Sequence, residues 1–84
     1  MLVQPLAQRA LAKIAPRYRE ALVTFIFGGL AENPKRRGKP LRGDLDGMWS
    51  ARRGDFRVLY RLDTANRTLH VRQIAGRADV YRPE

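Results

Sequence analysis

The segment from Phe56 to Leu62 constrains the fold most, because its side chains alternate strictly between two kinds. Large apolar or aromatic residues occupy every second position: Phe56, Val58, Tyr60 and Leu62. The positions between them are Arg57, Leu59 and Arg61. A period of two predicts a half-buried strand that carries arginines on its open face. Met48 to Arg52 is predicted as its partner strand, and Arg53-Gly54-Asp55 supplies the tight turn of a hairpin.

Two helices are predicted before the hairpin. Apolar residues recur at helical spacing from Pro5 to Ala15 and again from Arg17 to about Leu30. Pro16 separates the two segments, so we expect an antiparallel helical hairpin with a very short connection. Gly28-Gly29 should weaken the end of the second helix, and Asn33-Pro34 should end it.

A loop from Pro34 to Gly43 and three strands are expected to follow. The strands are predicted at about Gly47–Arg52, Asp55–Asp63 and Arg67–Ile74. In the last strand Leu69 and Val71 share a face, but Ile74 falls on the opposite one, which predicts a bulge near Gln73 or an early end to the strand. Two helices followed by a run of strands predict a single α+β domain over residues 1–84, with the helical hairpin on one face of a small antiparallel sheet.

The composition narrows the classes of function. Seventeen Lys and Arg against eight Asp and Glu give a formal net charge of +9, which implies a polyanionic or acidic partner. The chain has no cysteine, which excludes disulfides and thiolate chemistry and fits a reducing cytoplasm. No apolar run approaches the roughly 18 residues of a membrane span, so we expect a soluble, cytoplasmic protein without membrane contact.

Metal and histidine chemistry are not expected. No Asp, Glu and His residues share metal-ligand spacing, and Asp44 and Asp46 are better interpreted as turn formers, so neither metal nor cofactor is predicted. His70 is the sole histidine, which rules out a ribonuclease mechanism that needs two. Trp49 could stack on a base, but a tryptophan on a strand that faces helices is more often part of the core.

The segment from Lys39 to Asp63, KPLRGDLDGMWSARRGDFRVLYRLD, closely resembles the RelE branch of the RelE/ParE superfamily of bacterial toxins. The resemblance implies a toxin of a type II toxin–antitoxin system that cleaves messenger RNA in the ribosomal A site. In that reaction the 2′-hydroxyl attacks the adjacent phosphate. Members of this family begin with a strand that leads into the first helix. Only Met1 to Gln4 precede Pro5 here, so the first strand should be short or missing.

The resemblance also implies site residues. Arg57 falls on the arginine of the family's strand motif, Arg77 and Tyr81 match an arginine and a tyrosine in the family's tail, and Arg52 lies at a position that is often basic. Arg57, Arg77, Tyr81 and Arg52 are therefore the predicted catalytic residues. The arginines would stabilise charge on the phosphorane, and Tyr81 would transfer a proton or stack on a base. A ring packed on the sheet is an equal alternative for Tyr81.

Other basic residues are candidates for contact with RNA or the ribosome. They are Lys35, Arg36, Arg37, Lys39, Arg42, Arg53 and Arg61. Phosphate contacts of this kind would position the substrate without selecting its sequence. For Arg53 and Arg61 a solvated surface role is favoured, and a solvated charge run is the usual alternative for the others.

Three functions remain open at this stage. The best-known RelE enzymes carry two lysines on the strand aligned with Met48–Arg52, where this chain has Met48 and Ser50. Arginine cannot act as a base, so either Tyr81 or Lys39 substitutes, or the nuclease is slow or inactive. The ParE branch, which poisons DNA gyrase by protein contact, is the second function. A general basic RNA-binding module is the third.

A cognate acidic antitoxin is the predicted partner under either toxin hypothesis. We expect it to be partly disordered alone and to lay a helix across the basic face or the helical hairpin. The promoter DNA of such a pair would be contacted only through the antitoxin complex.

Overall fold

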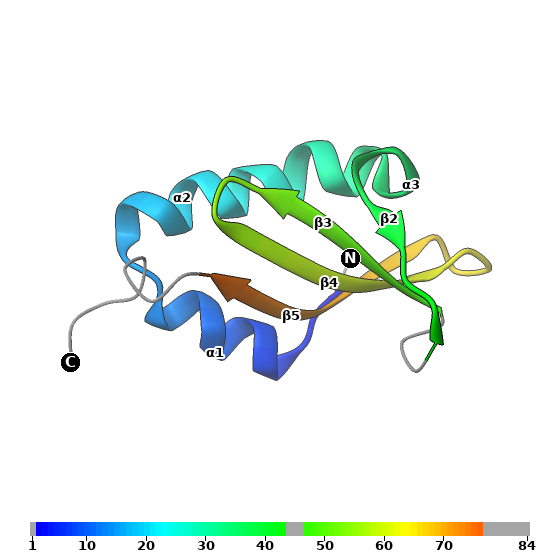
Figure 1. Cartoon of the computed structure of the whole chain (residues 1–84), viewed down its shortest axis with the longest axis horizontal. Helices are drawn as coiled ribbons and strands as arrows, with labels where there is room; N and C mark the ends of the chain where they lie inside the picture. The colour runs from blue at the N-terminus through cyan, green and yellow to red at the C-terminus, as the bar shows by residue number, and fades with distance from the viewer. Residues whose placement is uncertain (1, 44–46, 77–84) are drawn as a thin grey trace.

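A five-stranded sheet carries its helices on one face (Figure 1). The computed structural model describes residues 2–43 and 47–76. In sheet order the strands are β1 (Leu2–Val3), β5 (Thr68–Gly76), β4 (Phe56–Asp63), β3 (Met48–Arg53) and β2 (Lys39–Pro40). The pairs β2–β3, β3–β4 and β4–β5 are antiparallel, whereas β1 runs parallel to β5. The predicted α+β architecture is confirmed, and the sheet is mixed because of β1.

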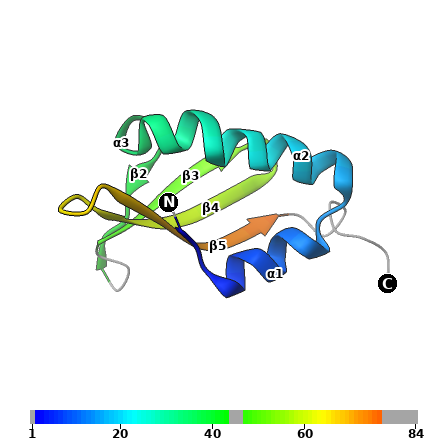
Figure 2. The ribbon, with the colours of Figure 1, turned by 180° about the vertical axis from the view of Figure 1, so that it is seen from behind.

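The helical hairpin consists of α1 (Pro5–Lys13) and α2 (Pro16–Phe25). A π-helix, η1 (Ile26–Leu30), directly follows α2. Seen from both sides of the molecule, α1 lies beside β5 and α2 lies along β3 (Figure 2). The first helix ends two residues earlier than predicted. Ile14 and Ala15 leave the helical region, with ψ of 139° and 140°. For Ala15 the cause is Pro16, because a proline disfavours helical backbone in the residue before it.

Arg19 holds the two helices together at this tight connection. Its guanidinium group donates hydrogen bonds to the carbonyl oxygens of Leu11 (2.9 Å), Ala12 (3.2 Å) and Ile14 (2.9 Å). The last carbonyls of a helix have no partner within the helix, and a cation at that end also interacts favourably with the helix dipole. One side chain of α2 therefore caps α1.

The core lies between the helices and the covered face of the sheet. From the helix layer it contains Ala7, Leu22, Ile26 and Leu30, together with Ile14 in the connection between α1 and α2. Its strand residues are Ala51, Phe56, Val58, Tyr60, Leu69, Val71 and Ile74. The alternation predicted for β4 is confirmed, since Phe56, Val58 and Tyr60 are buried while Arg57 and Arg61 are exposed. Within the described residues, no helix combines the length and the apolar character that crossing a bilayer demands.

The segment from Pro34 to Gly43, predicted as a loop, contains regular structure instead. A one-turn helix, α3 (Pro34–Arg37), is followed by the two-residue strand β2. Pro34 suits the first position of a helix, and Pro40 suits an edge strand, where a missing N–H costs no ladder bond. Lys39 pairs with Ser50, and the Leu41 amide donates to the Met48 carbonyl at 2.8 Å.

Two further details of the sheet match the sequence. In β5 the register jumps between Gln73, opposite Leu59, and Val71, opposite Tyr60. Arg72 is thus the extra residue of a β-bulge, which confirms the bulge predicted near Gln73 and returns Ile74 to the core face. The first strand is short, as expected: Leu2 pairs with His70 and Val3 with Val71.

Candidate nucleic-acid interface

Two arginines lie side by side on the open face of the sheet. Arg52 on β3 pairs with Arg57 on β4, and both side chains are exposed. Residues opposite each other in an antiparallel pair have Cβ atoms about 5 Å apart, and like charges at that separation repel each other. On β5 the neighbour of Arg57 is Ala75, which adds no charge. This arrangement suits an anionic ligand better than it suits the isolated fold.

A groove of about 630 Å³ surrounds this pair of arginines. Five cationic residues from four different elements line it: Arg36, Arg37, Lys39, Arg52 and Arg57. The rest of the lining is Gly38, Leu41, Ser50 and Leu59. None of these described lining residues carries a carboxylate. We refer to this feature below as the basic groove.

The floor of the basic groove is set by the register of the sheet. Lys39, Ser50, Leu59 and Gln73 lie in one row across β2, β3, β4 and β5. Leu59 is half-buried although it faces away from the helices. Leu59 is the one apolar side chain of this row, and the cations lie around it. This arrangement accommodates phosphates at the sides and a ribose at the centre.

Tyr60 fixes the wall that α3 contributes to the groove. Its hydroxyl donates a 2.5 Å hydrogen bond to the Pro34 carbonyl oxygen, and the side chain is fully buried. Gly38 is needed beside it, because a Cβ at that position would lie 2.0 Å from the Tyr60 hydroxyl and 2.9 Å from the Ser50 carbonyl oxygen. The start of α3 and the approach to β2 are thus held against the sheet.

Burial also disfavours the charged form of Tyr60. Desolvation raises the pKa of its hydroxyl to about 12, because the charged phenolate is disfavoured away from water. Tyr60 therefore stays protonated at neutral pH. It acts as a hydrogen-bond donor that positions α3, and it cannot serve as a base for the groove.

Arg37 is supported from the helix layer. An added Cβ on Gly29 would lie 3.4 Å from the Arg37 Nε atom, so the guanidinium group packs directly against the backbone of η1.

Gly28-Gly29 is predicted to weaken the end of the second helix. The helical winding there widens to a π-helix, continues to Glu32 and ends at Asn33, as Asn33-Pro34 predicted.

A second hollow, of about 240 Å³, adjoins the groove at the end of the sheet. Arg52 and Arg57 line both hollows. The other residues of the second one are Asp55, Phe56, Ala75 and Gly76. The two predicted catalytic residues Arg77 and Tyr81 lie outside the described residues.

The structure separates four predicted binding residues from the groove. Arg53 faces the helix layer, with its guanidinium carbon 5.9 Å from the centre of the Phe25 ring. Lys35 lies on the other side of α3 and lines a different pocket. Arg61 shares the open face but pairs with Met48 and His70, further along β4. Arg42 follows β2 and is exposed, outside the lining of the groove.

Trp49 and His70, two further residues considered in the sequence, contact other side chains of the fold. Trp49 is half-buried and stacks on Tyr60, with ring centroids 6.4 Å apart, which agrees with a core role. The Nδ1 atom of His70 and the side-chain amide nitrogen of Gln4 are 3.4 Å apart and form a hydrogen bond. Among residues 2–43 and 47–76, no three side chains of the types His, Cys, Asp and Glu are grouped so as to hold a metal ion.

Sequence reasoning missed the roles of Tyr60 and Gly38. The strand pattern places Tyr60 on the covered face, and a buried phenol needs a hydrogen-bond acceptor. That requirement was a usable signal, but the acceptor is 26 residues away in the chain. No local pattern identifies such a partner.

The fold and the groove together define a class: small α+β domains with a helical hairpin on one sheet face and a basic groove on the other. Residues 2–81 match the family model described as the ParE toxin of type II toxin–antitoxin systems, parDE, and the chain belongs to this family. It is of the RelE type, as its relatives indicate.

Two curated relatives come from Mycobacterium tuberculosis. Toxin RelG is 49% identical over 76 residues, which cover 90% of this chain and 87% of RelG. Toxin RelE is 46% identical over 76 residues, which cover 90% of this chain and 78% of that toxin. A solved structure, the toxin–antitoxin complex RelBE2 from the same organism, matches with a TM-score of 0.87 at 44% identity. That match covers 89% of this chain and 93% of the solved chain.

Proposed function

We propose that this toxin is an endoribonuclease that binds messenger RNA in the ribosomal A site and cleaves it there. The observation that carries the proposal is the basic groove, in which five cations surround Leu41, Ser50 and Leu59 without a carboxylate among the described lining residues. Such a groove suits the backbone of single-stranded RNA. The RelE name of a relative that is 46% identical supports the same function.

Arg57 and Arg52 would act on the reacting phosphate in the proposed mechanism. The 2′-hydroxyl loses its proton and attacks the adjacent phosphorus, the bond to the 5′-oxygen breaks, and that oxygen takes up a proton. The products are a 2′,3′-cyclic phosphate and a 5′-hydroxyl. The two opposed guanidinium groups stabilise the extra negative charge of the phosphorane. Arg36, Arg37 and Lys39 hold the flanking backbone in line.

The proton transfers fall to a short list of groups. Arginine keeps its proton at any physiological pH. Tyr60 is buried, and its hydroxyl donates a hydrogen bond to the Pro34 carbonyl oxygen, so neither is a candidate. Lys39 is the one lysine among the groove residues, and Tyr81 is the second candidate by family resemblance. With Met48 and Ser50 in place of two lysines, we expect slower cleavage than in enzymes that carry them.

Primer extension on messenger RNA in programmed ribosomes tests the proposal. Wild-type toxin should cut at the A-site codon, and Arg57→Ala should cut roughly 100- to 1,000-fold more slowly, as when one well-placed donor to a developing charge is lost. Arg9→Ala is the matched control, because Arg9 is exposed on α1, in the helix layer of the opposite face. Equal rates for wild type and Arg57→Ala would exclude Arg57 from the site.

Gyrase poisoning is the second candidate function, favoured by the family description that names ParE and by the absence of lysine from β3. In that case the basic face binds protein, and the toxin need not cleave RNA. Purified toxin that blocks gyrase supercoiling yet leaves ribosome-bound RNA intact would decide for this function.

We also infer a cognate acidic antitoxin as partner and a cytoplasmic site of action. The net charge of +9 and the likeness to the toxin–antitoxin complex RelBE2 support the partner. Co-expression with the antitoxin should raise the yield of soluble protein and abolish toxicity. If neither changes, this part of the proposal fails.

A further inference from the structure

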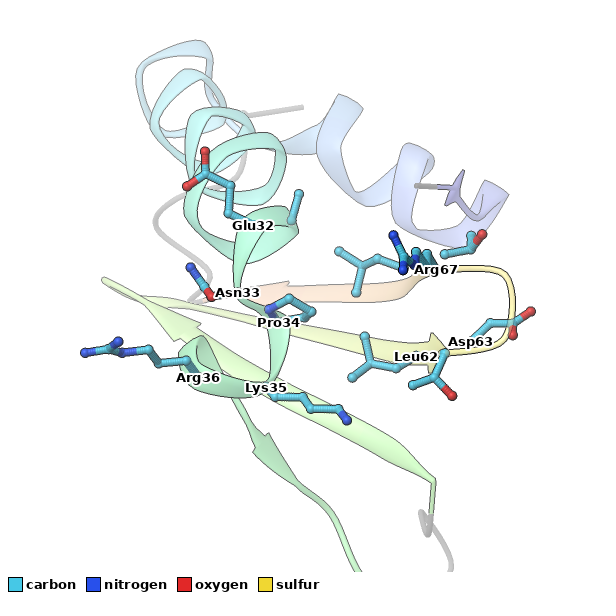
Figure 3. Close-up of a pocket in the computed structure, with 12 residues that line it drawn as sticks. Glu32, Asn33, Pro34, Lys35, Arg36, Leu62, Asp63 and Arg67 are labelled. Carbon is cyan, nitrogen blue, oxygen red and sulfur yellow. The ribbon is translucent and has the colours of Figure 1, made fainter.

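A pocket of about 450 Å³ lies on the other side of α3 from the basic groove. It opens between the end of the helix layer and the turn that joins β4 to β5 (Figure 3). The helix side contributes residues 31–36, and the strand side contributes residues 62–64 and 67–69. The catalytic mechanism proposed above uses none of the strand-side residues.

The floor of this pocket is aliphatic. Pro34 and Leu62 face each other across it and are both half-buried, and Leu69 and Ala31 complete it. Lys35 and Arg67 lie on either side of Leu62, whereas the guanidinium group of Arg36 points away from Leu62 (Figure 3). None of the lining residues is aromatic.

Arg67 occupies a backbone conformation that arginine does not favour. Its φ is +50°, and among the described residues it is the one non-glycine residue with a positive φ. The four-residue turn between Asp63 and Thr68 requires this conformation at its last position, where glycine or asparagine is the usual residue. An arginine at this position costs backbone free energy that a glycine would not.

Hydrogen bonds between Asp63 and Asn66 hold the rest of the turn. The carboxylate of Asp63 accepts hydrogen bonds from the Asn66 amide nitrogen at 3.2 Å and from the Asn66 side chain at 2.8 Å. These bonds lower the pKa of Asp63. Within residues 2–43 and 47–76, neither Lys35 nor Arg67 forms an ion pair.

We propose that this pocket anchors an acidic segment of the antitoxin, with one aliphatic side chain on Leu62 and Leu69 and carboxylates beside Lys35 and Arg67. An apolar centre between two available cations is complementary to such a segment. Glu32 and Asp63 also lie at the rim. A nucleic-acid backbone, with a phosphate at every nucleotide, would meet these carboxylates, whereas a peptide can place its carboxylates beside Lys35 and Arg67 alone. The proposal rests on the antitoxin partner inferred above and is independent of the nuclease activity.

Arg67→Gly tests the proposal, because it should change stability and binding in opposite directions. Glycine relieves the positive φ, so the melting temperature should rise by about 4 °C. Loss of the cation should weaken binding of the purified antitoxin about tenfold, measured as Kd by fluorescence titration. Arg67→Lys should restore the affinity while leaving the melting temperature at the wild-type value. Arg72→Ala, which removes an exposed arginine from the bulge of β5, should leave the Kd unchanged.

Two results would overturn the proposal. If Arg67→Gly binds antitoxin as tightly as wild type, the pocket is not its anchor. If Arg67→Gly instead weakens binding to 70S ribosomes and leaves the antitoxin Kd unchanged, the pocket belongs to RNA recognition. Neither readout depends on RNA cleavage, so failure of the proposed nuclease leaves the test intact. Wild-type toxin that binds no antitoxin would contradict the partner itself.

Discussion

Neighbouring residues of β4 have opposite surroundings. Val58 is completely buried against the helices, whereas Arg57 is exposed and faces a second arginine, Arg52. On the covered face, even the polar Tyr60 hydroxyl has a partner at Pro34. On the open face, like charges are brought together by the register of the strands.

The difference separates what folds the chain from what acts on a ligand. Side chains on the covered face have their packing and hydrogen-bond partners within the protein, so substitutions there should alter stability first. The open face is unfavourable electrostatically in the free protein, so changes there should alter ligand binding and leave the fold intact. Adjacent residues of one strand allow a direct test of this division.

The largest effect is expected from Val58→Asp compared with Leu59→Asp. A carboxylate at position 58 would be buried without a partner, which should cost at least about 4 kcal/mol and largely unfold so small a domain. Circular dichroism with thermal melting measures this. The same substitution one residue later should leave the melting curve almost unchanged, because position 59 faces the cations of the basic groove. It should instead weaken RNA binding. Equal destabilisation at both positions would contradict the division between the faces.

A second effect concerns alkaline pH. The pKa of Tyr60 is raised to about 12 in the folded protein, against about 10 in an unfolded chain. Below pH 10 both states are protonated and the stabilisation is complete. Between pH 10 and 12 the unfolded chain loses its proton first, so about 2 to 3 kcal/mol of stability should be lost.

Urea denaturation at pH 8 to 12 would measure this loss. Tyr60→Phe should lack it, although the variant should be about 1 kcal/mol less stable at neutral pH because the hydrogen bond to Pro34 is missing. Tyr18→Phe, which removes a hydroxyl from α2, should retain the full alkaline loss. A wild-type loss that persists in Tyr60→Phe would assign it to other groups.

The smallest effect is expected at Gly38. Its alanine variant should be less stable by about 1 to 2 kcal/mol, because the new methyl group overlaps the Tyr60 hydroxyl and crowds Ser50. The cost should shrink in a Tyr60→Phe background, since the closest contact is then gone, and a double-mutant cycle measures this coupling.

Gly28→Ala is the matched control for Gly38→Ala. A Cβ at position 28 would meet no atom within 4 Å, and alanine favours helical backbone over glycine. We therefore expect Gly28→Ala to be neutral or stabilising.

In the double-mutant cycle, additive effects of Gly38→Ala and Tyr60→Phe would show that positions 38 and 60 do not interact.

The sequence predicted most of the fold because the signals were local. Alternation gave β4, Pro16 separated the helices, and the odd spacing of Val71 and Ile74 gave the bulge. The short helix α3 and strand β2 were missed, because both are stabilised by distant residues. Tyr60 holds the start of α3, and Ser50 pairs with β2.

The candidate site was predictable by residue type but not by grouping. Charge patterns and family resemblance selected the basic residues. Arg53 was assigned to the hairpin turn and Lys35 to a loop, however, so neither was given a face of the sheet. Arg53 follows Arg52 directly, and the period of two sends it to the helix side. Lys35 precedes Arg36 in a segment predicted as a loop, so its direction could not be inferred before α3 was known.

The parallel pairing of β1 with β5 has a consequence for the order of folding. The helical hairpin and the antiparallel strands β3 to β5 form from contacts that are close in sequence, which are fast to make. Leu2 and His70 come from opposite ends of the chain, so their pairing closes the largest loop for only two residues of strand. We expect β1 to join the sheet last and to open first in local unfolding. Opening would expose the backbone of β5 at Leu69 to Val71 without disturbing the basic groove, which lies at the other side of the sheet.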